Sequence, residues 1–180
     1  EGSLIAMLAA QKVPVAAVVS IAGAGRPAGD LLLEQLAGVP PALLEDARRI
    51  IAELTAGRTV GQVPAELQTL FRPSVQPYLI SWFRYDPAAE AAKLEMPLLV
   101  IQGTTDVQVA VADAERLARA SGKARLFIID GMNHILKDVP PDADAQVRSY
   151  SDPALPLSPT LANAIRSFVV PSLRRRAVTR

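Results

Sequence analysis

The sequence predicts an α/β fold built on a parallel sheet, and three observations support this prediction. Apolar runs without polar alternation occur at 15–21 and 97–103, which is typical of strands that are covered on both faces. A third strand-like run follows at 124–129. Helical segments of about 10 to 15 residues alternate with such runs, as they do in βαβ units.

The first two elements are expected to be a helix and a buried strand. The run from Ser3 to Ala10 is rich in Leu, Ile, Met and Ala, which suits a helix buried on most of its surface. Pro14 ends this helix, and the β-branched run 15–21 then forms the strand. The glycines of Gly23-Ala24-Gly25 stop that strand.

The segment 26–86 predicts helices and loops only. Pro40 and Pro41 open a helix with apolar residues at i, i+3, i+4 and i+7, and Gly57 closes it. Shorter helices are expected around 65–71 and from about Pro77. We therefore expect an all-helical insertion between two core segments, residues 1–25 and 87–180.

After the insertion, strands and helices alternate again. The strand 97–103 precedes an amphipathic helix from Val109 to Ser121, and the strand 124–129 follows. The Pro- and Asp-rich segment 139–159 predicts a loop, and a last amphipathic helix runs from Pro159 or Thr160 to Val169.

Composition excludes several classes of protein. The 180 residues are 50% hydrophobic, which indicates one globular domain or a large piece of one. With 19 Lys+Arg against 18 Asp+Glu, the charge gives no reason to expect nucleic acid or an acidic membrane as a partner. The absence of cysteine excludes disulfides, Cys-ligated zinc and a cysteine nucleophile, but assigns no compartment. No run is suited to span a membrane, because Lys12 and Pro14 interrupt the longest apolar stretch.

Two polar loops follow the second and third predicted strands. Asp106 lies just after 97–103, and His134, the one histidine in the sequence, lies just after 124–129. In a parallel sheet, catalytic and binding groups gather at the carboxyl ends of the strands. The two residues are 28 positions apart, a length that one helix and one strand can fold back. We therefore expect the carboxylate and the imidazole to meet.

A carboxylate beside an imidazole performs defined chemistry. It accepts the Nδ1 proton and stabilises the imidazolium, which leaves the other nitrogen free to act as a general base toward a hydroxyl. Two structural alternatives remain open on local sequence alone. Asp106 could cap a helix or form a turn, and His134 could be a structural loop residue. No cofactor site or metal site is predicted.

The order apolar strand, Gly-x-x-Asp, helix, apolar strand, Gly-x-x-His resembles the C-terminal half of the α/β-hydrolase superfamily. The opening Glu1-Gly2-Ser3 is similar to the end of the nucleophile elbow G-x-S-x-G running into its helix. The helical block 26–86 lies where these enzymes insert a lid or cap. The resemblance covers the whole sequence, but only as the second part of the fold.

The resemblance implies a role for each site residue. Asp106 would be the triad acid, His134 the general base, and the backbone N–H of Glu1 an oxyanion donor. The serine nucleophile would be the residue before Glu1, so the 180 residues by themselves are expected to be inactive. Ser3 does not replace it, because Ser3 lies in the first turn of the helix.

The resulting hypothesis is a serine hydrolase that cleaves a small carboxylic ester or acyl substrate by an acyl-enzyme mechanism. The aromatic side chains Tyr78, Trp82 and Phe83 could line a substrate pocket or pack the helical block. The missing N-terminal half, a partner chain or a dimer is expected to cover the open edge of the sheet. A non-catalytic binding relative remains open, as do a peptidase, a C–C hydrolase and a dehalogenase.

Overall fold

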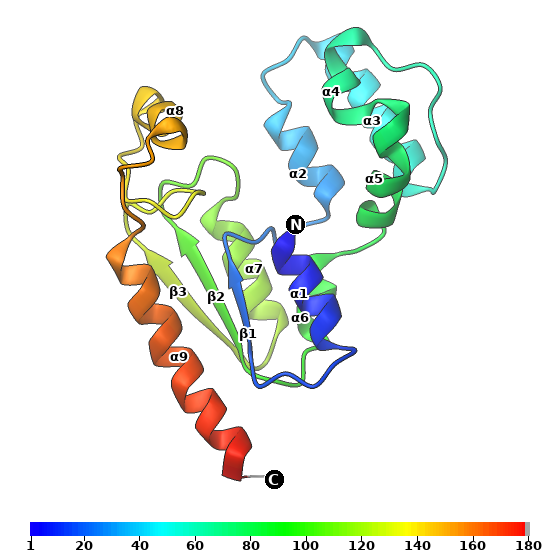
Figure 1. The fold of residues 1–180 in the computed structure, drawn as a ribbon. Coiled ribbons are helices and arrows are strands. Elements are labelled where there is room, and N and C mark those ends of the chain that lie inside the picture. The colour runs from blue at the N-terminus through cyan, green and yellow to red at the C-terminus, as the bar shows by residue number, and fades with distance from the viewer. Residues whose placement is uncertain (179–180) are drawn as a thin grey trace. The chain divides into compact units, whose positions relative to one another are not determined.

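The computed structural model describes residues 1–178, which form two compact units (Figure 1). One unit combines Glu1–Gly25 with the chain from Pro87 onward, and it contains the sheet. The other unit is Arg26–Asp86, which contains helices and turns but no strand. Each unit has its own hydrophobic core.

The sheet has three parallel strands in the order β1-β2-β3. These strands are β1 (Val18–Ile21), β2 (Leu98–Gly103) and β3 (Ala124–Ile129). All three predicted strands are confirmed, although β1 is shorter than the predicted run 15–21. β1 begins at Val18, which pairs with Leu98, the first residue of β2. β2 is buried at all six positions, as expected for a central strand covered on both faces.

Helices cover both faces of this sheet (Figure 1). The helices α1 (Gly2–Ala10), α6 (Pro87–Ala92) and α7 (Val111–Ala120) pack on one face, and α9 (Pro159–Val178) packs on the other. Alternate side chains of β2 enter the two cores. Leu98 and Val100 pack with Met7 of α1, whereas Ile101 packs with Phe168 of α9.

The prediction of a loop over 139–159 is wrong, because the segment contains α8 (Ala143–Ser151). Asp142 caps this helix, with its Oδ1 accepting a hydrogen bond from the Ala145 N–H at 2.8 Å. The buried residues of α8 are Gln146 and Ser149, so the helix lacks the apolar periodicity from which helices are predicted. The last helix, α9, also extends beyond the predicted end at Val169 and contains Pro171.

The helical unit packs around its own core. Its α-helices are α2 (Ala28–Gln35), α3 (Pro41–Thr55), α4 (Gln68–Phe71) and α5 (Gln76–Phe83), with short 3-10 turns at Ala65–Leu67 and Pro73–Val75. Ile50 and Leu54 of α3 are fully buried, as the predicted helical spacing requires. The buried amide of Gln76 accepts the Val60 N–H and donates to the carbonyls of Val60 and Phe71, which ties α5 to the preceding loop.

We expect Leu98→Ala to lower the free energy of unfolding by about 2–5 kcal/mol, because Leu98 is 0% exposed in the centre of the sheet. The matched control is Leu157→Ala, since Leu157 is 59% exposed and its truncation should change stability by less than about 0.5 kcal/mol. Urea denaturation of the full-length protein measures both values. Equal losses for the two variants would contradict the assigned core.

Candidate active site

The loops that follow β2 and β3 touch through their backbones. A Cβ added at Gly103 would lie 1.8 Å from the carbonyl oxygen of Met132, so only glycine fits there. Next to this contact, the Thr105 N–H donates to the Met132 carbonyl at 3.2 Å and the Thr104 N–H donates to the Ile129 carbonyl at 3.0 Å. The two loops are therefore held in direct contact.

Two threonine hydroxyls strengthen this connection. The hydroxyl of Thr104 donates to Asp130 Oδ1 at 2.9 Å and accepts the Gly131 N–H, also at 2.9 Å. The hydroxyl of Thr105 donates to the Gly131 carbonyl at 2.8 Å. Gly131 has a φ of 74°, a conformation that glycine adopts without strain. This network fixes the start of the loop that carries His134.

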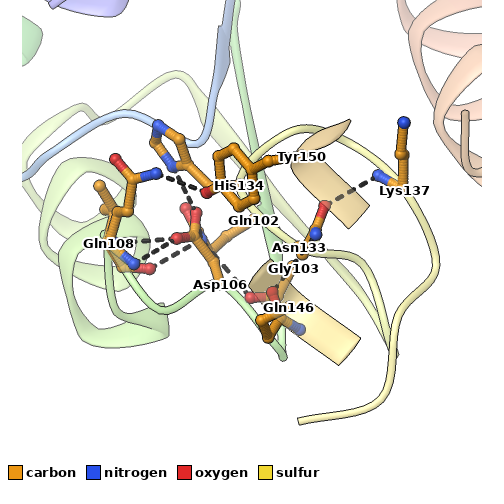
Figure 2. A network of polar contacts seen from close by, with 10 residues as sticks. Gln102, Gly103, Asp106, Gln108, Asn133, His134, Lys137, Gln146 and Tyr150 are labelled. Atoms are coloured by element: carbon orange, nitrogen blue, oxygen red, sulfur yellow. Dashed lines mark hydrogen bonds and ion pairs between the residues drawn. The ribbon is translucent and has the colours of Figure 1, made fainter. Parts of the chain in front are cut away.

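The structure brings Asp106 and His134 together, as the sequence predicts. His134 Nδ1 lies 2.9 Å from Asp106 Oδ2 (Figure 2). The Asp106 side chain is 0% exposed, whereas the His134 side chain is 30% exposed. In Figure 2 the second ring nitrogen of His134 points away from Asp106. One edge of the imidazole is thus held by a buried carboxylate while the other edge remains accessible.

Three further donors hold the carboxylate of Asp106. Its Oδ1 accepts the N–H groups of Gln108 at 2.8 Å and Val109 at 2.9 Å, and its Oδ2 also accepts Gln102 Nε2 at 2.9 Å. Asp106 therefore forms a turn before α7, which is one of the structural roles that its local sequence predicts. It also orients the imidazole of His134. The side chain performs both roles because its two oxygens face different partners.

These contacts set the charge of Asp106. Burial raises the pKa of this carboxyl, but the hydrogen bonds from His134, Val109, Gln108 and Gln102 lower it by more. The net result is a pKa below the ordinary value of 3.8. The carboxylate is therefore charged at neutral pH, and it accepts a hydrogen bond from the Nδ1–H of His134.

A pocket of 230 Å³ lies beside the imidazole. It is lined by Glu1, Gly2, Ser3, Ile21, Ala22, Gly23, His134 and Leu136. These residues come from the N-cap and first turn of α1, the end of β1 and the turn after it, and the loop after β3. Ala22 and Leu136 have positive φ angles of 51° and 67°, which are uncommon for residues with a side chain and occur often at functional sites.

Glu1 and Ser3 lie at this pocket, at the beginning of α1. Glu1 is the N-cap residue, and its carbonyl accepts the Ile5 N–H at 3.2 Å. The Ser3 hydroxyl lies 2.6 Å from the hydroxyl of Ser20, which is fully buried in β1. Ser3 is therefore a first-turn helical residue, as the sequence predicts, and its hydroxyl also joins α1 to β1.

The predicted aromatic residues lie on α5 of the helical unit. Phe83 is 4% exposed in the core of that unit, and Trp82 packs against this core. Tyr78 is 42% exposed, with its ring centroid 5.8 Å from that of Trp82. Packing accounts for Phe83 and Trp82, and a substrate-binding role for the three residues stays a prediction.

Three polar residues near the pair were not predicted from the sequence, namely Gln102, Gln108 and Asn133. Gln102 is the second-last residue of the otherwise apolar strand β2, and that isolated amide was the available signal. Asn133 and Gln108 flank His134 and Asp106 but match no motif of their own. All three are part of the polar network in Figure 2.

Residues 1–178 show neither a metal-binding cluster nor a membrane-spanning helix. This part of the chain contains no group of three or more His, Cys, Asp or Glu side chains arranged to hold a metal ion. It also contains no helix with the length and hydropathy needed to cross a membrane.

Comparisons with known proteins identify the fold. No protein-family model matches the chain, and no curated protein matches it. Among solved structures, it is similar to BpoC of Mycobacterium tuberculosis H37Rv, a candidate non-heme bromoperoxidase, with a TM-score of 0.51 and 16% identity over 94% of this chain. The chain has an α/β-hydrolase fold.

Two further solved structures also match the chain. NosK of Streptomyces actuosus matches 92% of the chain at 20% identity with a TM-score of 0.48. MGS-MChE2, an α/β hydrolase from the metagenome of lagoon sediments in Morocco, matches 83% at 21% identity with a TM-score of 0.44. The chain spans 64% of BpoC, 65% of NosK and 56% of MGS-MChE2, so it corresponds to less than two thirds of each.

We expect Gly103→Ala to separate the two loops, because the new Cβ would overlap the Met132 carbonyl oxygen. The matched control is Gly122→Ala, since nothing lies within 4 Å of a Cβ at Gly122. Thermal unfolding of the full-length protein should show a lower Tm for Gly103→Ala and little change for Gly122→Ala. Similar Tm values for both variants would contradict the close backbone contact.

We expect Asp106→Asn to change how stability depends on pH. Because the folded-state pKa of Asp106 is lowered, its ionisation stabilises the fold fully above the ordinary value of 3.8, and this contribution is lost as pH falls through the folded-state pKa. The difference in urea midpoint between the parent protein and Asp106→Asn should thus be largest near neutral pH and decrease in acid. A difference that stays constant from neutral to acid pH would show that the charge of Asp106 contributes nothing.

Proposed function

We propose that the protein is a serine hydrolase that cleaves carboxylic esters through an acyl-enzyme. The observation that carries this proposal is the bond between His134 Nδ1 and the buried, charged Asp106, beside a pocket at the start of α1. Such a pair orients an imidazole as a general base toward a hydroxyl. The α/β-hydrolase fold supports this proposal, because it carries the acid and the base on these two loops.

We propose that the nucleophile is a serine immediately before Glu1 in the full-length protein. The pocket geometry supports this position, because Glu1 and His134 line the same 230 Å³ space. His134 Nε2 then removes the serine proton as the hydroxyl oxygen attacks the ester carbonyl carbon. His134 returns the proton to the leaving alcohol, and the acyl group stays on the serine.

The second half of the reaction uses the same base. His134 deprotonates a water molecule, which attacks the acyl carbon, and the proton returns to the serine as the carboxylic acid leaves. In both halves of the reaction, Asp106 accepts a hydrogen bond from the Nδ1–H of His134 and stabilises the imidazolium. This chemistry requires no cofactor.

The oxyanion of the tetrahedral intermediate needs backbone donors. We assign one of them to the N–H of Glu1, which precedes the first turn of α1, where the helix dipole also favours negative charge. The second donor would come from the remainder of the hydrolase. Removal of one such donor in other enzymes reduces kcat by about 10²- to 10³-fold.

The open edge of the sheet supports a contribution from outside this chain. Within residues 1–178, β1 pairs with β2 and with no other strand. We propose that the remaining edge of β1 pairs with the rest of the hydrolase or with a partner chain. Tyr78, Trp82 and Phe83 are proposed to favour an apolar substrate.

We expect His134→Ala in the full-length protein to lower kcat for a short aryl ester by at least about 10³-fold, because the general base is lost. The Tm should change little, since the His134 side chain is 30% exposed and its one hydrogen bond is to Asp106. Steady-state kinetics and thermal unfolding on the same samples measure both quantities. Full activity in His134→Ala would remove this residue from the mechanism.

The nucleophile is tested by labelling the full-length protein with a fluorophosphonate, which reacts with activated serines. Peptide mapping by mass spectrometry then locates the label. Label on the residue before Glu1 supports the assigned nucleophile, whereas label on Ser3 contradicts it. No label on any residue would overturn the serine-hydrolase proposal and favour a non-catalytic relative or a hydrolase with another nucleophile.

A further inference from the structure

The loop that carries His134 is anchored to α8 by the residue next to the histidine. The Asn133 side chain is fully buried. Its Nδ2 donates to Ser149 Oγ at 2.9 Å and to Gln146 Oε1 at 3.3 Å, and both acceptors belong to α8. An amide buried with these partners is fixed in place, because any movement would leave polar groups without hydrogen bonds.

Asn133 also shapes the loop around His134. Its Oδ1 accepts the Lys137 N–H at 3.1 Å, and its own N–H donates to the Lys137 carbonyl at 2.9 Å. The Asn133 carbonyl accepts the Leu136 N–H at 3.0 Å. These bonds close a short turn from 133 to 137, and His134 lies within it.

The side chain of Lys137 adds a second connection to the same helix. Its Nζ donates to the carbonyl of Ser149 at 3.1 Å and to that of Asp152 at 2.5 Å, at the C-terminal end of α8. A cation at the C-terminus of a helix is also favoured by the helix dipole. Both ends of the turn 133–137 are therefore bonded to α8.

The same helix reaches the loop that carries Asp106. Gln108 Nε2 donates to the Tyr150 hydroxyl at 2.5 Å, and the Gln108 N–H donates to Asp106 Oδ1 at 2.8 Å (Figure 2). Consecutive residues of α8, Ser149 and Tyr150, thus contact the base loop and the acid loop. This arrangement makes α8 a common support for the two halves of the pair.

We propose that Asn133 is a positioning residue that keeps His134 Nδ1 within hydrogen-bond distance of Asp106 by fixing the turn 133–137 to α8. Asn133 does not line the pocket, so it acts through His134. The expected effect of Asn133 on catalysis rests on the proposed hydrolase function, whereas its effect on the hydrogen bond between His134 and Asp106 does not.

The test compares Asn133→Ala with a control of similar chemistry in the full-length protein. The control is Glu90→Ala, because Glu90 is buried on α6 and bonds Gln11 at 2.9 Å and Lys93 at 2.7 Å, away from both loops. Proton NMR detects the Nδ1 proton of His134, which resonates at low field when it is bonded to a carboxylate. Its assignment comes from the absence of the signal in His134→Gln.

We expect Asn133→Ala to abolish or broaden this signal and to lower kcat by about 10²-fold with little change in KM, because a small misplacement of a catalytic group is costly. Glu90→Ala should retain the signal and kcat even if its Tm falls as far as the Tm of Asn133→Ala. Ser149→Ala, which removes one acceptor and keeps Asn133, should give a weaker form of the same effect and serves if Asn133→Ala does not fold.

The outcomes separate this inference from the proposed function. A signal that persists unchanged in Asn133→Ala and Ser149→Ala would overturn the positioning role, whatever the activity. Loss of the signal in both variants, in a protein that hydrolyses no ester, would support the positioning role and count against the hydrolase alone.

Discussion

The contact between Gly103 and the Met132 carbonyl is the constraint on which the candidate site depends. A side chain at 103 would force the loops after β2 and β3 apart, and the hydrogen bonds from Thr104 and Thr105 to the second loop would then be lost. Since Asp106 follows one end of this contact and His134 follows the other, the backbone packing brings the two loops close enough for the 2.9 Å bond between His134 Nδ1 and Asp106 Oδ2. The site is therefore built at the edge where two parallel strands end.

The side chain of Asp106 is more deeply buried than the side chain of His134. The Asp106 side chain is fully buried and accepts hydrogen bonds from donors that lower its pKa, so these donors stabilise its negative charge. His134 is partly exposed and lines the pocket, where it can meet a reacting group. A rigid charged acid behind an accessible base is the arrangement that general-base catalysis requires, because reorganisation during proton transfer is small.

Helix α8 shows how a polar helix can serve a site in an α/β fold. Its buried residues, Gln146 and Ser149, accept hydrogen bonds from the loop of His134 in place of apolar contacts. Directional bonds of this kind define one position for the loop, whereas apolar contacts allow small shifts at similar free energy. The core around the sheet is apolar. The stability of the fold therefore depends on β2 and its flanking helices, whereas the placement of His134 depends on the polar contacts of α8.

The sequence by itself determined the strands, most helices and the meeting of Asp106 with His134. Apolar runs bounded by Pro and Gly depend on local composition, and parallel strands necessarily end at one edge of the sheet. Only the tertiary structure decided the roles of Gln102, Gln108 and Asn133, and it revealed α8 where a loop was predicted. The bonds from Gln108 to Tyr150 and from Asn133 to Ser149 join residues 42 and 16 positions apart, and the bond from Gln102 to Asp106 depends on how the loop after β2 turns back. A buried polar residue also leaves no periodic signal in the sequence.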